Sequence, residues 1–148
     1  HMAGDPLNLF AGIFLREGDR HIGNIKLGPI NVHHRRADIG LLVGDRACWG
    51  KGYASEAIAI LSDFAFGRLG LHRLTAGMYA ENEGSARAFE KAGYAREGLL
   101  RGHWLCDGTP PPSSAAECAA VVLRVVQCAE QRRAMLRRGG SPQGVGSR

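Results

Sequence analysis

Two glycines one residue apart, Gly50 and Gly52, stand between an apolar run and a long helical pattern. The apolar run at residues 39–43 predicts a buried strand, and the residues after Gly52 follow a helical period. Glycine lets the backbone approach a ligand closely, and the first N–H groups of a helix have no partner inside the helix. These donors and the positive end of the helix dipole favour a phosphate or pyrophosphate. The stretch therefore predicts an anion-binding site.

Two better-known phosphate-binding loops do not fit this stretch. A Walker loop needs Lys and then Ser or Thr after its last glycine, whereas Gly52 is followed by Tyr53 and Ala54. The dinucleotide fingerprint needs glycine or alanine three residues after Gly52, and that residue is Ser55. An isolated glycine turn is more often a plain entry into a helix, so the rest of the chain must decide.

A second polar pair, Asn82 and Ser85, follows a strand pattern at residues 71–79. The amide of Asn82 can reach an extended molecule lying across the sheet, and Ser85 in the first helical turn points the same way. Each residue also has a plainer explanation, an N-cap for Asn82 and a first-turn serine for Ser85. The order of elements favours a site, because a glycine turn, a helix, a parallel strand and then Asn-x-x-Ser follow one another.

The remaining pattern predicts a mixed α/β (α+β) fold. Apolar segments at residues 7–15 and 22–30 flank a hairpin loop, and residues 38–43 form a third strand, so the first part is an antiparallel meander. The helix after Gly52 closes at Gly67, and the strand after it can lie parallel to the third strand. Residues 82–92 predict a second helix, and residues 94–105 predict a further strand with a bend at Gly98. The first helix has one apolar face, formed by Ala54, Ala57, Ile58, Leu61 and Ala65.

The chain changes character after residue 105. Residues 1–105 form the predicted core, and residues 106–148 form a proline-rich linker followed by a basic C-terminal segment. Residues 115–138 are ambiguous: the later half favours a helix, and the valine-rich residues 119–127 fit a strand or a helix. The end of the chain, residues 141–148, is expected to be disordered.

Composition limits the class of protein. A chain of 148 residues with 45% hydrophobic and 22% charged residues predicts one globular domain. It has no apolar run of membrane-spanning length and no visible secretory leader, and its four cysteines lack CxxC spacing. Reduced thiols and a cytoplasmic location are expected. The net charge of +5 lies largely in the tail without interleaved aromatics, so nucleic acid is not favoured as a partner. The pair His33-His34 lacks ligands at metal spacing, so no metal site is expected.

Taken in series, three motifs resemble the GNAT superfamily of acyl-CoA-dependent N-acetyltransferases, and within it the RimJ/RimL type. They are the run Trp49-Gly-Lys-Gly-Tyr-Ala-Ser-Glu-Ala57, the segments Phe64-Ala-Phe and Leu69-Gly-Leu-His-Arg73, and Asn82-Glu-Gly-Ser85 with Glu90-Lys-Ala-Gly-Tyr94. The resemblance covers residues 8–105. It implies a mostly antiparallel sheet, flanked by helices, with a splayed pair of parallel strands that binds acetyl-CoA.

The resemblance also implies which residues hold the cofactor. The glycine turn would cradle the pyrophosphate through backbone N–H groups, and pantetheine would pair with the backbone of the strand that ends at residues 41–43. Asn82 would hold the pantetheine arm from the other side. The cofactor-binding residues implied in this way are Leu41, Leu42, Val43, Trp49, Gly50, Lys51, Gly52, Tyr53, Ala54, Ser55, Asn82, Ala88, Phe89 and Lys91.

The implied chemistry is direct attack of a neutral primary amine on the thioester, which needs a base, an oxyanion donor and an acid. Many relatives use a tyrosine of the second helix as the acid, but here that residue is Phe89. Ser85 is the replacement that the resemblance implies. For the base the sequence offers Asp38 and Glu81, each of which is also explained as a surface carboxylate. The acceptor is expected to be a protein N-terminus or a small-molecule amine.

Three departures from the family pattern leave an alternative open. Trp49 occupies the position where the family has Gln or Arg, and the tail after residue 105 does not clearly match the closing strand. The resemblance begins at the family's second strand, so the first strand and two helices of the acceptor wall have no counterpart. The alternative is a non-catalytic or degenerate acyl-CoA-binding module. A homodimer would complete the site or cover exposed sheet edges.

Overall fold

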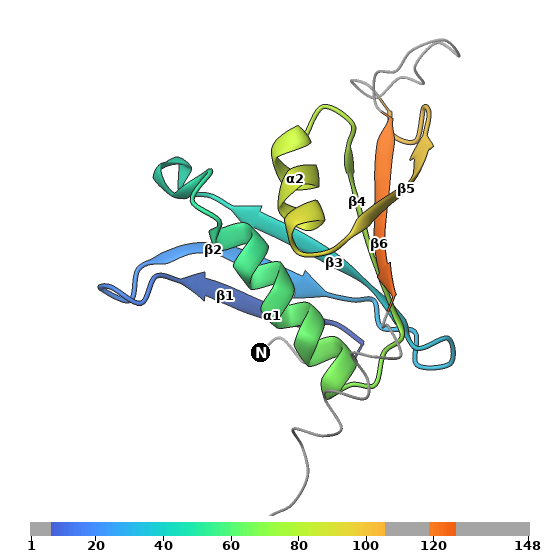
Figure 1. Cartoon of the computed structure of the whole chain (residues 1–148), viewed down its shortest axis with the longest axis horizontal. Coiled ribbons are helices and arrows are strands. Elements are labelled where there is room, and N and C mark those ends of the chain that lie inside the picture. The colour runs from blue at the N-terminus through green and yellow to red at the C-terminus, as the bar shows by residue number, and fades with distance from the viewer. Residues whose placement is uncertain (1–6, 106–118, 127–148) are drawn as a thin grey trace, which may run out of the picture.

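The structure is a computed structural model that describes residues 7–105 and 119–126. Figure 1 shows a six-stranded sheet in the order β1-β2-β3-β4-β6-β5, with two helices packed against it. The strands are β1 (Leu9–Phe14), β2 (His21–Leu27), β3 (Arg36–Val43), β4 (Arg73–Tyr79), β5 (Ala95–Leu100) and β6 (Ala120–Val126). The helices are α1 (Tyr53–Gly67), α2 (Glu83–Lys91) and a short 3-10 turn, η1 (Arg46–Cys48).

The sheet confirms the predicted mixed topology. β1, β2 and β3 form an antiparallel meander, and β3 pairs with β4 in parallel because α1 carries the chain back across the sheet. β5 is shorter than predicted: it ends at Leu100, and its pairing shifts register between Arg96 and Gly98, where a bend was expected. The fold is therefore the mostly antiparallel α/β sheet with flanking helices that the sequence predicts.

The valine-rich segment left open by the sequence is a strand. β6 lies between β4 and β5 and pairs antiparallel with both, along the whole length of β4. Residues 120–126 thus belong to the same sheet as the predicted core, across the proposed boundary at residue 105. The helix favoured for the later half of residues 115–138 lies outside the described residues.

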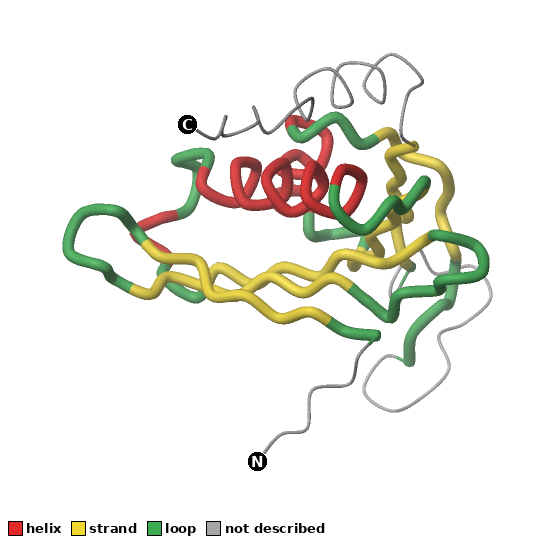
Figure 2. The backbone as a smooth tube through the Cα atoms, turned by 90° about the horizontal axis from the view of Figure 1, so that it is seen from below, coloured by secondary structure: helices red, strands yellow, loops and turns green. Residues whose placement is uncertain are grey.

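Both helices pack on the same face of the sheet, as Figure 2 shows. α1 contacts β2 and β3, whereas α2 contacts β4, β5 and β6. The core lies between these layers, and its most deeply buried large side chains are Leu27, Ile58, Leu74, Phe89 and Leu123. Burial of these apolar groups is the main force that holds the helices on the sheet.

The opposite face of the sheet, here called the open face, has no helix over it in the part of the chain that the structure describes. Side chains of β3 alternate, with Ala37 and Ile39 buried and Asp38 and Leu42 exposed. Successive strand residues point to opposite faces, so Asp38 lies on the open face.

One buried polar contact joins α1 to the segment that enters β5. The Ser62 hydroxyl donates to the Ile58 carbonyl at 2.7 Å and lies 2.8 Å from the Tyr94 hydroxyl. The Tyr94 ring packs edge-on against Phe89 with 5.0 Å between centroids. Desolvation by burial raises the pKa of Tyr94 to about 12, although the hydrogen bond to Ser62 opposes this change. Tyr94 thus links Ser62 of α1 to Phe89 of α2.

Candidate active site

The site begins where β3 and β4 separate. The two strands pair only through Arg36–Arg73, Ala37–Leu74 and Asp38–Thr75, although they continue to Val43 and Tyr79. Figure 1 shows them diverging beyond these pairs, an arrangement here called the fork. From residue 39 onward β3 pairs with β2 alone, so the edge of β3 that faces β4 has no strand partner. Unpaired strand backbone of this kind can bind an extended molecule.

The glycine turn follows β3 at the open end of the fork. Gly50 and Gly52 have φ of +71° and +89°, and a Cβ at either would meet no atom within 4 Å. The backbone conformation, and not crowding, therefore requires glycine at these two positions. Within the described residues, nothing accepts a hydrogen bond from the backbone N–H groups of residues 50–55. The turn thus presents free donors at the N-terminus of α1, as an anion site requires.

Trp49 fixes the turn to the end of β3. Its indole Nε1 donates to the Val43 carbonyl at 2.9 Å, and the Arg46 guanidinium lies 5.7 Å from the ring centroid. Over half of the Trp49 surface remains exposed. The residue that departs from the family pattern therefore anchors the turn through its ring nitrogen. Arg46 was not predicted, because a cation above an aromatic ring has no fixed sequence spacing.

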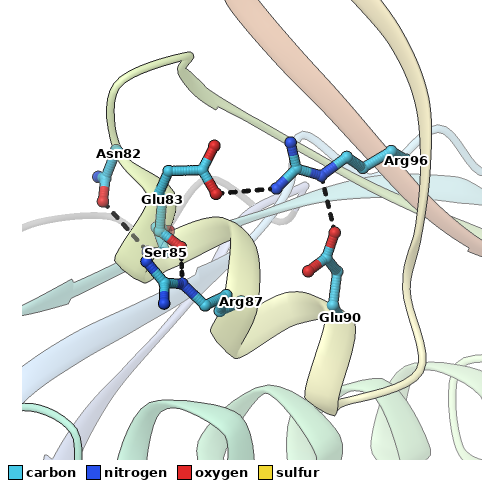
Figure 3. Close-up of polar contacts among 6 residues, drawn as sticks. All are labelled: Asn82, Glu83, Ser85, Arg87, Glu90 and Arg96. Atoms are coloured by element: carbon cyan, nitrogen blue, oxygen red, sulfur yellow. Dashed lines mark hydrogen bonds and ion pairs between the residues drawn. The ribbon is translucent and has the colours of Figure 1, made fainter.

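The N-terminus of α2 follows β4 at the other side of the fork. Asn82 caps the helix, and its Oδ1 accepts from the Ser85 backbone N–H at 3.1 Å (Figure 3). The capping interpretation of Asn82 is therefore confirmed. The cap uses only the oxygen, so the Asn82 NH₂ group and the half-buried Ser85 hydroxyl have no hydrogen-bond partner among residues 7–105 and 119–126. Both groups remain available to a ligand.

An arginine network holds α2 against β5, as Figure 3 shows. The Arg96 Nε lies 2.7 Å from Glu90, and its terminal nitrogen lies 3.0 Å from Glu83. Hydrogen bonds to Glu90 and then Glu83 raise the pKa of the exposed Arg96 guanidinium. The Arg87 Nε donates to the Glu83 carbonyl at 3.4 Å. These contacts orient the first turn of the helix that bears Ser85.

Asp38 lies at the closed end of the fork, where it accepts a hydrogen bond from the Thr75 hydroxyl. Thr75 was missed from the sequence, because only the β3–β4 register places it beside Asp38. Asp38 is on the open face, whereas Ser85 belongs to the helix layer on the other face. The two predicted catalytic residues therefore stand on opposite sides of the sheet. Glu81, the other carboxylate considered, is exposed in the loop before α2.

The remaining predicted cofactor-binding residues differ in their surroundings. Leu41 and Val43 are half-buried and Leu42 is exposed, in the part of β3 that pairs with β2 alone. Tyr53, Ala54 and Ser55 are half-buried in the first turn of α1, and Lys51 is exposed just before it. In α2, Ala88 is half-buried and Lys91 is exposed, but Phe89 is only 2% exposed and belongs to the core. The structure thus gathers the turn, the strand end and the cap around the fork, with Phe89 behind them.

Comparison with known proteins identifies the family of this chain. Residues 3–95 match the acetyltransferase (GNAT) domain family. The chain belongs to this family. It is 37% identical over 99 residues to the uncharacterized N-acetyltransferase YoaA of Bacillus subtilis, a match that covers 67% of this chain and 55% of YoaA. It is 31% identical over 86 residues to the spermidine N(1)-acetyltransferase of Escherichia coli, which covers 58% of this chain and 46% of that enzyme.

The solved structures agree with the GNAT fold. The spermidine N-acetyltransferase of Vibrio cholerae in complex with CoA and spermine superposes with a TM-score of 0.70 at 23% identity. That match covers 83% of this chain and 68% of the solved chain. The present chain spans about half the length of the curated relatives it matches.

Among the described residues, no group of three or more His, Cys, Asp or Glu side chains is arranged to hold a metal ion. None of the helices in that part of the chain is long and apolar enough to cross a membrane.

Proposed function

We propose that this GNAT domain binds acetyl-CoA and transfers its acetyl group to a primary amine, as an enzyme of the RimJ/RimL type. The observation that carries this proposal is the fork between β3 and β4. At its open end lies the glycine turn, whose backbone N–H groups have no acceptor among the described residues. The turn offers these N–H donors to a pyrophosphate. The unpaired edge of β3 offers backbone groups to the amides of pantetheine.

Acetyl-CoA supplies an acetyl thioester, so that attack by a neutral amine yields an N-acetyl amine and a free thiol. Ser85 is proposed to donate a proton to the departing sulfur, since its hydroxyl is half-buried and unpaired among the described residues. Asp38, held by Thr75, is proposed to accept the proton that the amine loses.

The proposal is tested by titrating the purified protein with acetyl-CoA in a calorimeter and then measuring thiol release against a panel of amines. Binding in the micromolar range with turnover supports the enzyme. Binding without turnover for any amine favours the alternative, a non-catalytic acyl-CoA-binding module. No binding refutes both.

The role of Ser85 has its own test. Ser85→Ala is expected to lower turnover by about a hundredfold, because general acid catalysis contributes at least that factor. Acetyl-CoA affinity should stay unchanged, since the Asn82 cap uses the backbone N–H of residue 85 and not its hydroxyl. Near-normal turnover in this variant would remove Ser85 from the mechanism.

A further inference from the structure

On the open face, the first residue beyond the last β3–β4 pair is a glycine in both strands of the fork. Asp38 and Thr75 pair, and two residues further along on the same face are Gly40 of β3 and Gly77 of β4. A Cβ at either glycine would meet no atom within 4 Å, and neither has a left-handed φ. Packing and turn geometry therefore do not require these glycines, which weaken their strands. Glycine inside a strand often marks a bulge, a bend or a place where a ligand or another backbone approaches closely, and the open space at Gly40 and Gly77 would admit a ligand.

Around these glycines the open face is cationic. Arg73 and Arg124 both contact Glu97, with the Arg124 Nε 2.9 Å from that carboxylate. One carboxylate is thus shared by two guanidinium groups, and each guanidinium has further N–H donors to offer. Arg36 is next to Arg73 in the β3–β4 register and makes no ion pair within the described residues. On the described strands, the ionised side chains of the open face are Lys26, Arg36, Asp38, Arg73, Glu97 and Arg124.

The register places one of these cations in line with Asp38. Asp38, Thr75 and Arg124 form a single row across β3, β4 and β6. Neighbouring strands are about 4.8 Å apart, so the backbones of Asp38 and Arg124 are separated by roughly 10 Å. An amine at Asp38 and an anionic group at Arg124 therefore fit the same small molecule, several bonds apart.

We infer that the acceptor is a primary amine that also bears a carboxylate, bound on the open face between Asp38 and Arg124. This inference rests on the proposed function. The surplus of cations attracts the carboxylate of the acceptor, and Asp38 accepts the proton that the amine loses. The same surplus repels a polyamine, so the preferred acceptor differs from that of the spermidine acetyltransferases to which the chain is similar.

The test uses three amines of nearly the same size that differ in the charge at the far end: 4-aminobutanoate, butylamine and 1,4-diaminobutane. Thiol release gives kcat/KM for each with acetyl-CoA, and shifts of the β3 and β4 amide resonances give binding of each without turnover. We expect kcat/KM and affinity to be highest for the anionic 4-aminobutanoate, lower for the neutral butylamine and lowest for the cationic 1,4-diaminobutane. Successive amines should differ by about three- to tenfold. Peptides that begin Ala-Glu, Ala-Gln and Ala-Lys repeat the series, and distinguish a protein N-terminus from a small amino acid.

Two variants change the preference in opposite directions. Arg124→Gln is expected to reduce the advantage of 4-aminobutanoate, whereas Glu97→Gln is expected to increase it by releasing both arginines. A structural contribution alone would not produce opposite shifts. Arg16→Gln, in the exposed hairpin loop after β1, is the matched control and should leave the order unchanged.

The outcomes separate this inference from the proposed function. If acetyl-CoA binds and the three amines are bound and used equally, the inference is wrong and the proposed function stands. A preference for 1,4-diaminobutane, or variants that shift the order in the same direction, also overturns it. If acetyl-CoA fails to bind, the proposed function falls, and the amide resonances still show whether the open face selects the anionic amine.

Discussion

Replacing Tyr94 with Phe is expected to change the sign of its effect on stability between neutral and strongly alkaline pH. The Tyr94 side chain is 4% exposed, and burial raises its pKa to about 12 from an ordinary value of 10.0. The folded chain therefore holds the phenol proton more tightly than the unfolded chain. The stability that this provides is complete below pH 10 and is lost as the pH rises through about 12.

The magnitude follows from the two pKa values. Each pKa unit corresponds to 1.36 kcal/mol, so a shift of two units removes about 2.7 kcal/mol of stability by the end of the titration. At neutral pH, Tyr94→Phe loses only the hydrogen bond to Ser62, at a cost of about 1 kcal/mol. The variant should therefore be less stable than the wild type at pH 8 and more stable, by roughly 1.5 kcal/mol, above pH 12.

Urea unfolding of both proteins at intervals between pH 8 and pH 12.5 measures this difference. Tyr79→Phe is the matched control, because Tyr79 is 52% exposed and its removal leaves the Tyr94 contact intact. The control should lose stability in parallel with the wild type. Curves for Tyr94→Phe that also stay parallel to the wild type would refute the account of Tyr94 as a desolvated phenol.

Two glycine substitutions test the turn and the strand that lead into the site. Gly52→Ala forces a side chain to φ +89°, so holding the turn in its binding conformation costs about 1–2 kcal/mol, and calorimetry should show acetyl-CoA affinity five- to thirtyfold lower. Gly23→Ala places a Cβ against the Leu42 carbonyl oxygen and 2.9 Å from the Val43 Cα, and should lower the free energy of unfolding by about 2–3 kcal/mol. Gly98→Ala is the control, because its Cβ meets no atom within 4 Å, and it should change neither acetyl-CoA affinity nor the free energy of unfolding. A loss of either quantity as large as in the other two variants would contradict the reasoning.

Local patterns predicted most of the elements. The glycine turn and the helical period after it predicted α1, and Asn82 as the N-cap with Gly93 as the stop predicted α2. These signals are readable because caps and turns depend on residues close together in sequence. The helix between β3 and β4 implied that these two strands are parallel, because a crossover helix returns the chain to the same end of the sheet. Local pattern did not decide the valine-rich segment, because its hydrophobic pattern suits a strand or a helix. It is the strand β6 because it pairs with both β4 and β5.

The sequence by itself determined the glycine turn, the cap and the succession of strand and helix that identifies the family. Tertiary structure alone decided where the strands stop pairing, and therefore that Asp38 meets Thr75 at the closed end of the fork. It also decided that β6 brings Arg124 into the same row, a pairing of residues far apart in the chain. Between strands far apart in the chain no turn fixes the register, and the hydrophobic pattern specifies only which side chains face the core, so the pairing partners emerge only when the sheet packs.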